Sequence, residues 1–112
     1  MSTLEPKTEK PLVKRLVEDF IDIVILKNIR KKPEISGYDI IKLLYTKFHM
    51  LSSPGTIYSI LYSLERQNLI LGTTSQRKRV YKLTARGETF LRSCYGRDDQ
   101  IHAVLASILS EA

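Results

Sequence analysis

The side chains best placed for chemistry in this sequence are hydroxyls, tyrosines and cations. Residues 52–67 read SSPGTIYSILYSLERQ, and their apolar members recur at the spacing of one helix face: Ile57, Ile60, Leu61 and Leu64. The opposite face is small, hydroxyl-rich and aromatic, and it carries Gly55, Ser59, Tyr62, Ser63 and Arg66. Hydroxyls and arginine are groups that hydrogen-bond to DNA base edges and phosphates. This face therefore predicts contact with a nucleic acid.

Local signals predict where this helix begins and ends. Two serines can cap it, and Pro54 suits its first position because a proline there loses no hydrogen bond. Asn68 can adopt the left-handed conformation that ends a helix. Near the helix start, Ser53 and Thr56 lie where backbone N–H groups favour a phosphate.

A basic cluster follows this helix. Strand-like segments at 69–71 and 80–83 flank residues 72–79, which read GTTSQRKR. This pattern predicts a β-hairpin whose tip presents Arg77, Lys78 and Arg79 to phosphates or to a minor groove. The alternative is a solvated edge hairpin whose cations only prevent aggregation.

Other polar and aromatic residues receive weaker predictions. Lys42 is expected to touch the DNA backbone from the preceding helix. Tyr58 lies on the flank of the helix, so packing and DNA contact both stay open for it. Tyr38 and Tyr81 are predicted to lie in the core.

The charge distribution supports a polyanionic partner. The chain has 112 residues and a net charge of +6, and residues 50–97 carry eight basic against two acidic side chains. This imbalance favours nucleic acid over an acidic membrane surface or an acidic protein. A merely solvated basic surface is the alternative.

The sequence lacks the parts of an enzyme or a metal site. His49 and His102 are its only histidines and lie far apart, so neither metal-ligand nor general-base spacing occurs, and we predict no cofactor. Cys94 is the only cysteine, which excludes an intramolecular disulfide. It is expected to pack on an apolar stripe, with oxidation sensing between two copies as the alternative. Charges interrupt the N-terminal apolar residues, so we expect no signal peptide or membrane span and a cytoplasmic protein.

The elements that must position these residues are mostly helices. After a tail at residues 1–10, one long helix is predicted over 11–31, ended by Pro33. Ser36 and Asp39 predict a capping box that opens the next helix, and a short turn leads from it to the helix at 54–67. Together with the hairpin, this is a winged helix-turn-helix over residues 11–84, a mostly α fold with a small β-wing.

The two ends of the chain predict self-association. Thr84 caps a last helix over residues 85–112, which we expect to be continuous and bent at Gly96. This helix is longer than the domain's own core needs, so its apolar stripe would be exposed in a monomer. Residues 20–26 of the N-terminal helix are apolar nearly all round. We therefore predict a homodimer through Phe20, Val24, Ile101, Val104, Leu105, Ile108 and Leu109.

Three motifs, in order and in register over residues 24–91, identify a resemblance. They are SGYDI at 36–40, SPGTIY at 53–58 with its continuation to Ile70, and RKRVYKLTARG at 77–87. With them the chain resembles the PadR-like winged-helix transcriptional regulators. The resemblance implies a dimeric DNA-binding regulator that reads the major groove with the helix at 54–67. It also implies a dimer built from the N-terminal and C-terminal helices.

These observations predict a homodimeric, sequence-specific transcriptional regulator, a repressor rather than an activator, on a pseudo-palindromic double-stranded operator. One alternative is a winged-helix protein-interaction module, which should lack a basic wing. Another is an architectural DNA binder without sequence preference. The sequence does not reveal whether a small-molecule effector exists.

Overall fold

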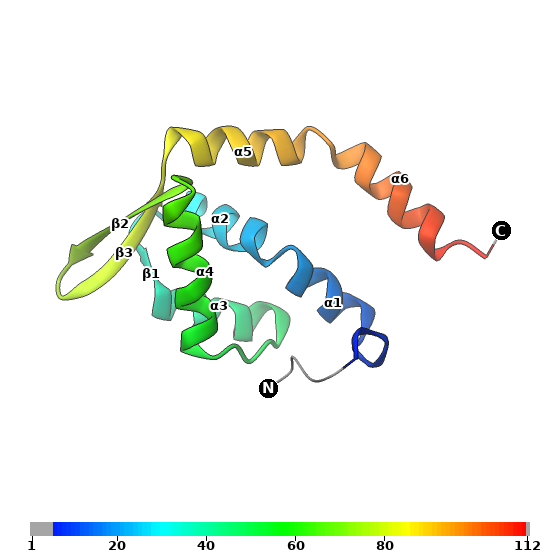
Figure 1. Cartoon of the computed structure of the whole chain (residues 1–112), viewed down its shortest axis with the longest axis horizontal. Coiled ribbons are helices and arrows are strands. Elements are labelled where there is room, and N and C mark those ends of the chain that lie inside the picture. Colours follow the sequence, from blue (N-terminus) through cyan, green and yellow to red (C-terminus); the bar gives the residue numbers. More distant parts are fainter. Residues whose placement is uncertain (1–5, 112) are drawn as a thin grey trace.

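The computed structural model describes residues 6–111 of the chain. A small antiparallel sheet lies at one end of a group of helices, and its hairpin projects away from them (Figure 1). In chain order the elements are η2 (Lys7–Glu9), α1 (Leu12–Asp19), α2 (Ile21–Lys31), β1 (Ile35–Ser36), α3 (Gly37–Phe48), α4 (Pro54–Arg66), β2 (Ile70–Ser75), β3 (Lys78–Leu83), α5 (Ala85–Tyr95) and α6 (Asp98–Leu109). Of the tail predicted at 1–10, residues 1–5 lie outside the described residues.

The core is formed where α2, α3, α4 and α5 meet the sheet. Its fully buried side chains are aliphatic, and they include Leu26, Leu44, Ile57, Leu61 and Leu91. The apolar face predicted for α4 is therefore the face that packs inward. Tyr81 is buried as predicted, whereas Tyr38 is exposed, so its predicted place in the core was wrong. Tyr38 follows the first residue of α3 on a side of the helix that faces solvent.

The predicted single helix over 11–31 is wrong, because it is broken at Phe20. This residue has φ −111° and ψ 24° and separates α1 from α2. Beyond the break α2 buries Ile25, Leu26 and Ile29, whereas α1 buries none of its residues. The apolar stripe continues through both helices, so the sequence pattern does not show where contact with the core begins.

The C-terminal helix is likewise two helices. Gly96 and Arg97 separate α5 from α6, at the residue where a bend was predicted. Glycine weakens a helix interior by about 0.5–1 kcal/mol relative to alanine, and α6 has no buried residue to offset that loss. The radius of gyration is 15.4 Å, against about 13 Å expected for a compact chain of this length. Figure 1 shows the reason, because α1 and α6 extend away from the core at the same end of the molecule.

The start of α3 follows the predicted capping box. Asp39 N donates to Ser36 Oγ over 3.1 Å, and Ser36 N donates to the Asp39 carboxylate over 3.2 Å. The hydrogen bond from the Ser36 backbone is the main reason that the pKa of Asp39 is lowered. Ser36 also pairs with Val80, so β1 adds a strand to the hairpin and ties α3 to it.

The hairpin strands are longer than the sequence indicated. β2 and β3 pair antiparallel from Ile70↔Leu83 to Ser75↔Lys78, and only Gln76 and Arg77 form the turn. Both turn residues have positive φ, 48° and 66°, as the type I′ form of a two-residue hairpin turn requires. The basic tip predicted at 72–79 is therefore mostly strand, and Lys78 and Arg79 belong to β3. The usual Asn-Gly signal is absent here, which hid the turn from sequence reasoning.

Candidate nucleic-acid interface

The N-terminus of α4 is capped as the sequence predicts. Thr56 N donates to Ser53 Oγ over 3.2 Å, and the Ser53 and Thr56 hydroxyls lie 2.8 Å apart. Asn68 has φ 61° and ends the helix in the left-handed conformation, as expected. Thr56 is exposed and Ser53 is within the same capping turn at the surface, so both predicted phosphate contacts lie at the open end of the helix.

The face of α4 opposite the core is open to solvent. Tyr58, Ser59, Tyr62, Ser63 and Arg66 are all exposed. The Arg66 guanidinium lies over the Tyr62 ring, 5.7 Å from its centroid. This contact limits the positions that the guanidinium can adopt. The structure therefore presents the predicted base-reading residues together on one surface, and their contact with DNA stays a prediction.

Tyr58 combines packing with exposure. Its side chain is 43% exposed, yet a Cβ on Gly37 would lie only 2.5 Å from the Tyr58 ring. The ring thus rests against the first turn of α3, and Gly37 provides the space for it. Sequence reasoning left both roles open for Tyr58 and missed the function of Gly37.

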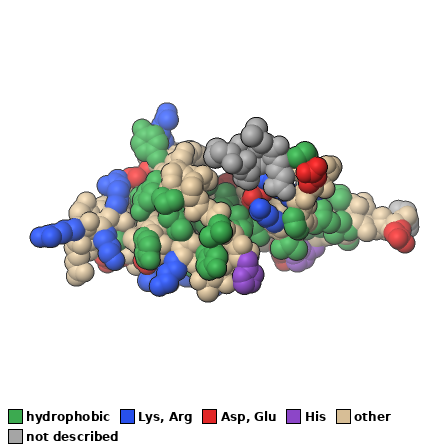
Figure 2. Space-filling view, turned by 90° about the horizontal axis from the view of Figure 1, so that it is seen from below, with side chains coloured by type: hydrophobic (Ala, Val, Ile, Leu, Met, Phe, Trp, Pro, Cys, Tyr) green, Lys and Arg blue, Asp and Glu red, His purple; other side chains and the backbone are tan. Residues whose placement is uncertain are grey.

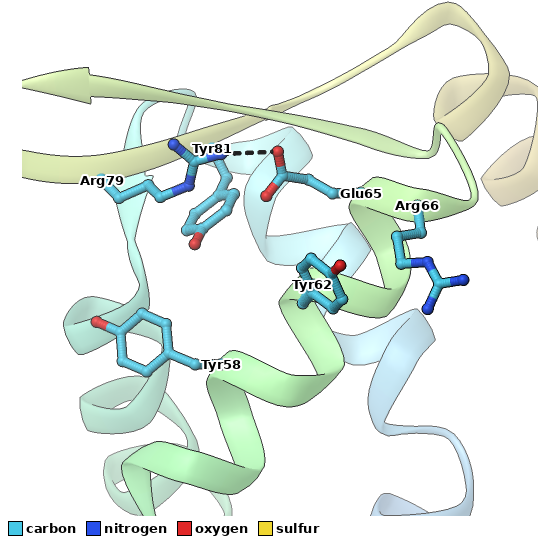
Figure 3. A pocket seen from close by; sticks show the side chains of 6 residues that line it. All are labelled: Tyr58, Tyr62, Glu65, Arg66, Arg79 and Tyr81. Atoms are coloured by element: carbon cyan, nitrogen blue, oxygen red, sulfur yellow. Dashed lines mark hydrogen bonds and ion pairs between the residues drawn. The ribbon is translucent and has the colours of Figure 1, made fainter.

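A hollow of about 420 Å³ lies between α4 and the hairpin (Figure 3). Its lining residues come from both elements and are Tyr58, Tyr62, Glu65, Arg66, Arg79 and Tyr81. Burial raises the pKa of the Tyr81 hydroxyl above its usual range. The exposed face of α4 and the wing therefore form one continuous surface.

Arg79 occupies a different position from the other wing cations. Its Nη2 lies 2.9 Å from Glu65 Oε2, and its guanidinium lies 6.0 Å from the centroid of the Tyr81 ring. The sequence did not predict this contact of Glu65 with Arg79, although Glu65 is the only acidic residue between positions 50 and 87. Its contact with Arg79 depends on the hairpin register, which the sequence pattern did not reveal.

The remaining predicted cations are exposed. Arg77 is in the hairpin turn and Lys78 begins β3, and neither has an ion pair within the part of the chain that the structure describes. Figure 2 shows Lys and Arg side chains projecting at the left end, where the hairpin lies. Lys42 is exposed on α3.

The predicted dimerisation residues fall into two groups. Phe20 and four residues of α6 are exposed, with 41% of Ile101, 52% of Val104, 69% of Ile108 and 62% of Leu109 open to solvent. Val24 and Leu105 are half-buried, and Val24 packs on the chain's own core. The structure also shows exposed Leu12, Val13 and Leu16 on α1, which were not among the predicted residues.

Cys94 is half-buried, and burial raises the pKa of its thiol. A raised pKa lowers the fraction of reactive thiolate at neutral pH. In residues 6–111 no three His, Cys, Asp or Glu side chains gather as a metal site would need. Nor does any described helix have the length and apolar character of a membrane span.

The profile of the transcriptional regulator PadR-like family matches residues 25–93, which is more than half of the chain. The chain belongs to the PadR-like family. Sequence reasoning had placed the resemblance over residues 24–91, and the match confirms it. A comparison with curated proteins gave no match.

Solved structures support the assignment to the PadR-like fold. A PadR family transcription regulator from hypervirulent Clostridium difficile is 29% identical, with a TM-score of 0.71 over 81% of this chain and 99% of that one. A PadR-like transcriptional regulator from Bacillus cereus is 23% identical, with a TM-score of 0.70 over 88% and 99%. MepR, a regulator of the Staphylococcus aureus efflux pump MepA, is 23% identical, with a TM-score of 0.63 over 88% and 73%. The predicted winged-helix fold class is confirmed.

Proposed function

We propose that this PadR-like protein is a homodimeric, sequence-specific DNA-binding regulator that represses transcription in the cytoplasm and has no enzymatic activity. Membership of a transcription-regulator family supports DNA binding. The observation that carries the finer proposal is the continuous surface formed by the exposed face of α4 and the wing. In this proposal α4 enters the major groove, and Arg77 and Lys78 contact phosphates from the wing.

The base-reading role belongs to the polar residues of α4. Tyr58, Ser59, Tyr62 and Ser63 offer hydroxyl groups, and Arg66 offers the paired donors that suit a guanine edge. Ser53 and Thr56 at the helix start, and Lys42 from α3, are proposed to contact the DNA backbone. These contacts would fix the orientation of α4 in the groove.

The dimer is proposed because two helices leave apolar side chains in water. Within the described residues neither α1 nor α6 buries a single side chain, although both carry an apolar stripe. A second copy would cover both stripes and align two α4 helices. Two such helices would meet half-sites about one helical turn apart on a pseudo-palindromic operator.

A protein-interaction module is the weaker alternative, because the outer face of α4 is polar and the wing tip is basic. An architectural role stays open, since Arg66 is the only arginine on the exposed face of α4. The two DNA-binding roles differ in sequence preference, which binding measurements can separate.

Removing the free wing cations tests the phosphate contacts. We expect Arg77→Gln with Lys78→Gln to weaken binding to all duplexes alike. The slope of log K against log salt should flatten by about 0.9 for each phosphate that the wing no longer neutralises, or about 3 to 4 over two wings. Fluorescence anisotropy titrations across a salt series measure this slope.

The matched control removes the same charge elsewhere, through Arg86→Gln with Arg97→Gln. Both residues are exposed and lie outside α4 and the hairpin. We expect a much smaller change in slope for the control pair. Equal slopes for the wing variant and the wild type would refute the wing assignment.

Arg66 is expected to discriminate between bases. Arg66→Ala should reduce affinity for the preferred sequence by about 1–3 kcal/mol and relax the preference at one base position. Competition with operators changed one base pair at a time measures both effects. Arg86→Ala serves as the control, because it removes the same side chain from an exposed position on α5, away from α4 and the hairpin. If the Arg66 variant keeps the base preference of the wild type, Arg66 does not contact the bases.

A further inference from the structure

Glu65 joins the last turn of α4 to both strands of the wing. Its Oε2 atom accepts a hydrogen bond from Gly72 N over 3.2 Å and another from Arg79 Nη2 over 2.9 Å. Gly72 is in β2 and Arg79 is in β3. A single carboxylate therefore contacts both strands of the hairpin, as Figure 3 shows for Arg79.

Gly72 makes room for the Arg79 side chain. A Cβ at position 72 would lie 2.8–2.9 Å from the Nη2, Cζ and Nε atoms of Arg79. Gly72 does not have a positive φ, so the backbone itself does not require glycine there. Because glycine weakens a strand, its presence needs another reason, and the guanidinium lying over it supplies one.

Charge gives a second reason for this arrangement. Glu65 is the only acid in α4 and lines the same hollow as Tyr62 and Arg66, on the surface proposed to meet DNA. An unpaired carboxylate there would repel phosphates. Its pairing with Arg79 cancels that charge and leaves Arg79 with less charge to offer a phosphate than Arg77 or Lys78 has.

We propose that Glu65, Gly72 and Arg79 form a latch that fixes the wing relative to α4, and that Arg79 is a positioning residue instead of a direct phosphate contact. This proposal rests on the proposed DNA-binding function. It changes the role that the sequence predicted for Arg79.

Gly72→Ala is the sharpest test, because it displaces the guanidinium without changing any charge. If the latch positions the wing, this variant should lose about tenfold in DNA affinity, with an unchanged salt slope. Arg79→Gln should lose a similar factor, and the double variant should lose no more than Arg79→Gln alone. Such non-additivity is expected of residues that act as one unit.

Thr73→Ala is the matched control, since Thr73 is an exposed residue of the same strand that pairs with Val80, on the opposite face of the hairpin from Arg79. It should bind DNA as the wild type does. Thermal melting of every variant checks that the fold is retained. If Gly72→Ala binds as tightly as the wild type or more tightly while Arg79→Gln binds more weakly, Arg79 contacts DNA directly and the latch is refuted.

A measurement without DNA separates the latch from the proposed function. Heteronuclear NOE values for the amides of residues 73–78 report the mobility of the free hairpin. They should fall in Gly72→Ala and in Arg79→Gln but not in Thr73→Ala. Unchanged values in the first two variants would overturn the latch. If the NOE values fall in the two variants but the wild type binds no duplex, the proposed DNA-binding function is wrong. The latch then has no role in positioning the wing on DNA.

Discussion

Val104→Glu is expected to convert the proposed homodimer into monomers and to lower affinity for a two-half-site operator by about a hundredfold or more. Val104 is 52% exposed on α6, between Ile101 and Ile108 on the same stripe. In a dimer the new carboxylate would be buried without a partner, a situation that costs about 3–5 kcal/mol. Each monomer would then bind a single half-site and lose the gain of about 10²–10⁴ that linked binding provides.

Sedimentation velocity gives the oligomeric state, and anisotropy on one-site and two-site duplexes gives the affinity. Ala103→Glu places the same charge on the opposite side of α6 and should stay dimeric with unchanged affinity. Ala103 is exposed as well, so the two variants differ mainly in which face of α6 they alter. A monomeric wild type, or a dimeric Val104→Glu protein, would contradict the proposed interface.

Gly87→Ala is expected to lower the free energy of unfolding by about 3 kcal/mol, a large effect for one methyl group. A Cβ at position 87 would lie 2.1 Å from the carbonyl oxygen of Leu69. That oxygen is held in place because it accepts the Thr84 backbone N–H over 3.1 Å. The first turn of α5 therefore has to move away from the sheet, which disturbs the buried Leu91.

Urea denaturation measures the free energy of unfolding of this variant. Gly55→Ala is the matched control, since a Cβ there has no heavy atom within 4 Å. In α4 this control should be neutral or stabilising by up to about 1 kcal/mol. If Gly87→Ala and the wild type have equal free energies of unfolding, α5 does not pack against the Leu69 carbonyl.

Helix starts could be predicted because they depend on residues three apart. Ser36, Ser53 and Thr84 each accept a hydrogen bond from a backbone N–H three positions later, as the sequence indicated. The exposed polar face of α4 followed from the helical period in the same way. Both signals depend on residues that lie close together in the chain, so they can be recognised in a single sequence.

Features that depend on distant contacts were predicted incompletely or missed. The break at Phe20 was missed, and the break at Gly96–Arg97 was predicted only as a bend, because both depend on where the core ends while the apolar stripes continue past both points. The pairing of Arg79 with Glu65 joins residues 14 apart and depends on the strand register. Register was hidden because Gln76 and Arg77 form the turn without a glycine.

The central claim is most directly tested by the binding of the full chain to DNA from upstream of its own gene and to a scrambled duplex. Fluorescence anisotropy across a salt series measures both. The proposed regulator should prefer the upstream duplex, and this preference should survive at high salt. Equal and steeply salt-dependent binding to both duplexes, or no binding to either at low salt, would contradict a sequence-specific regulator acting at its own promoter.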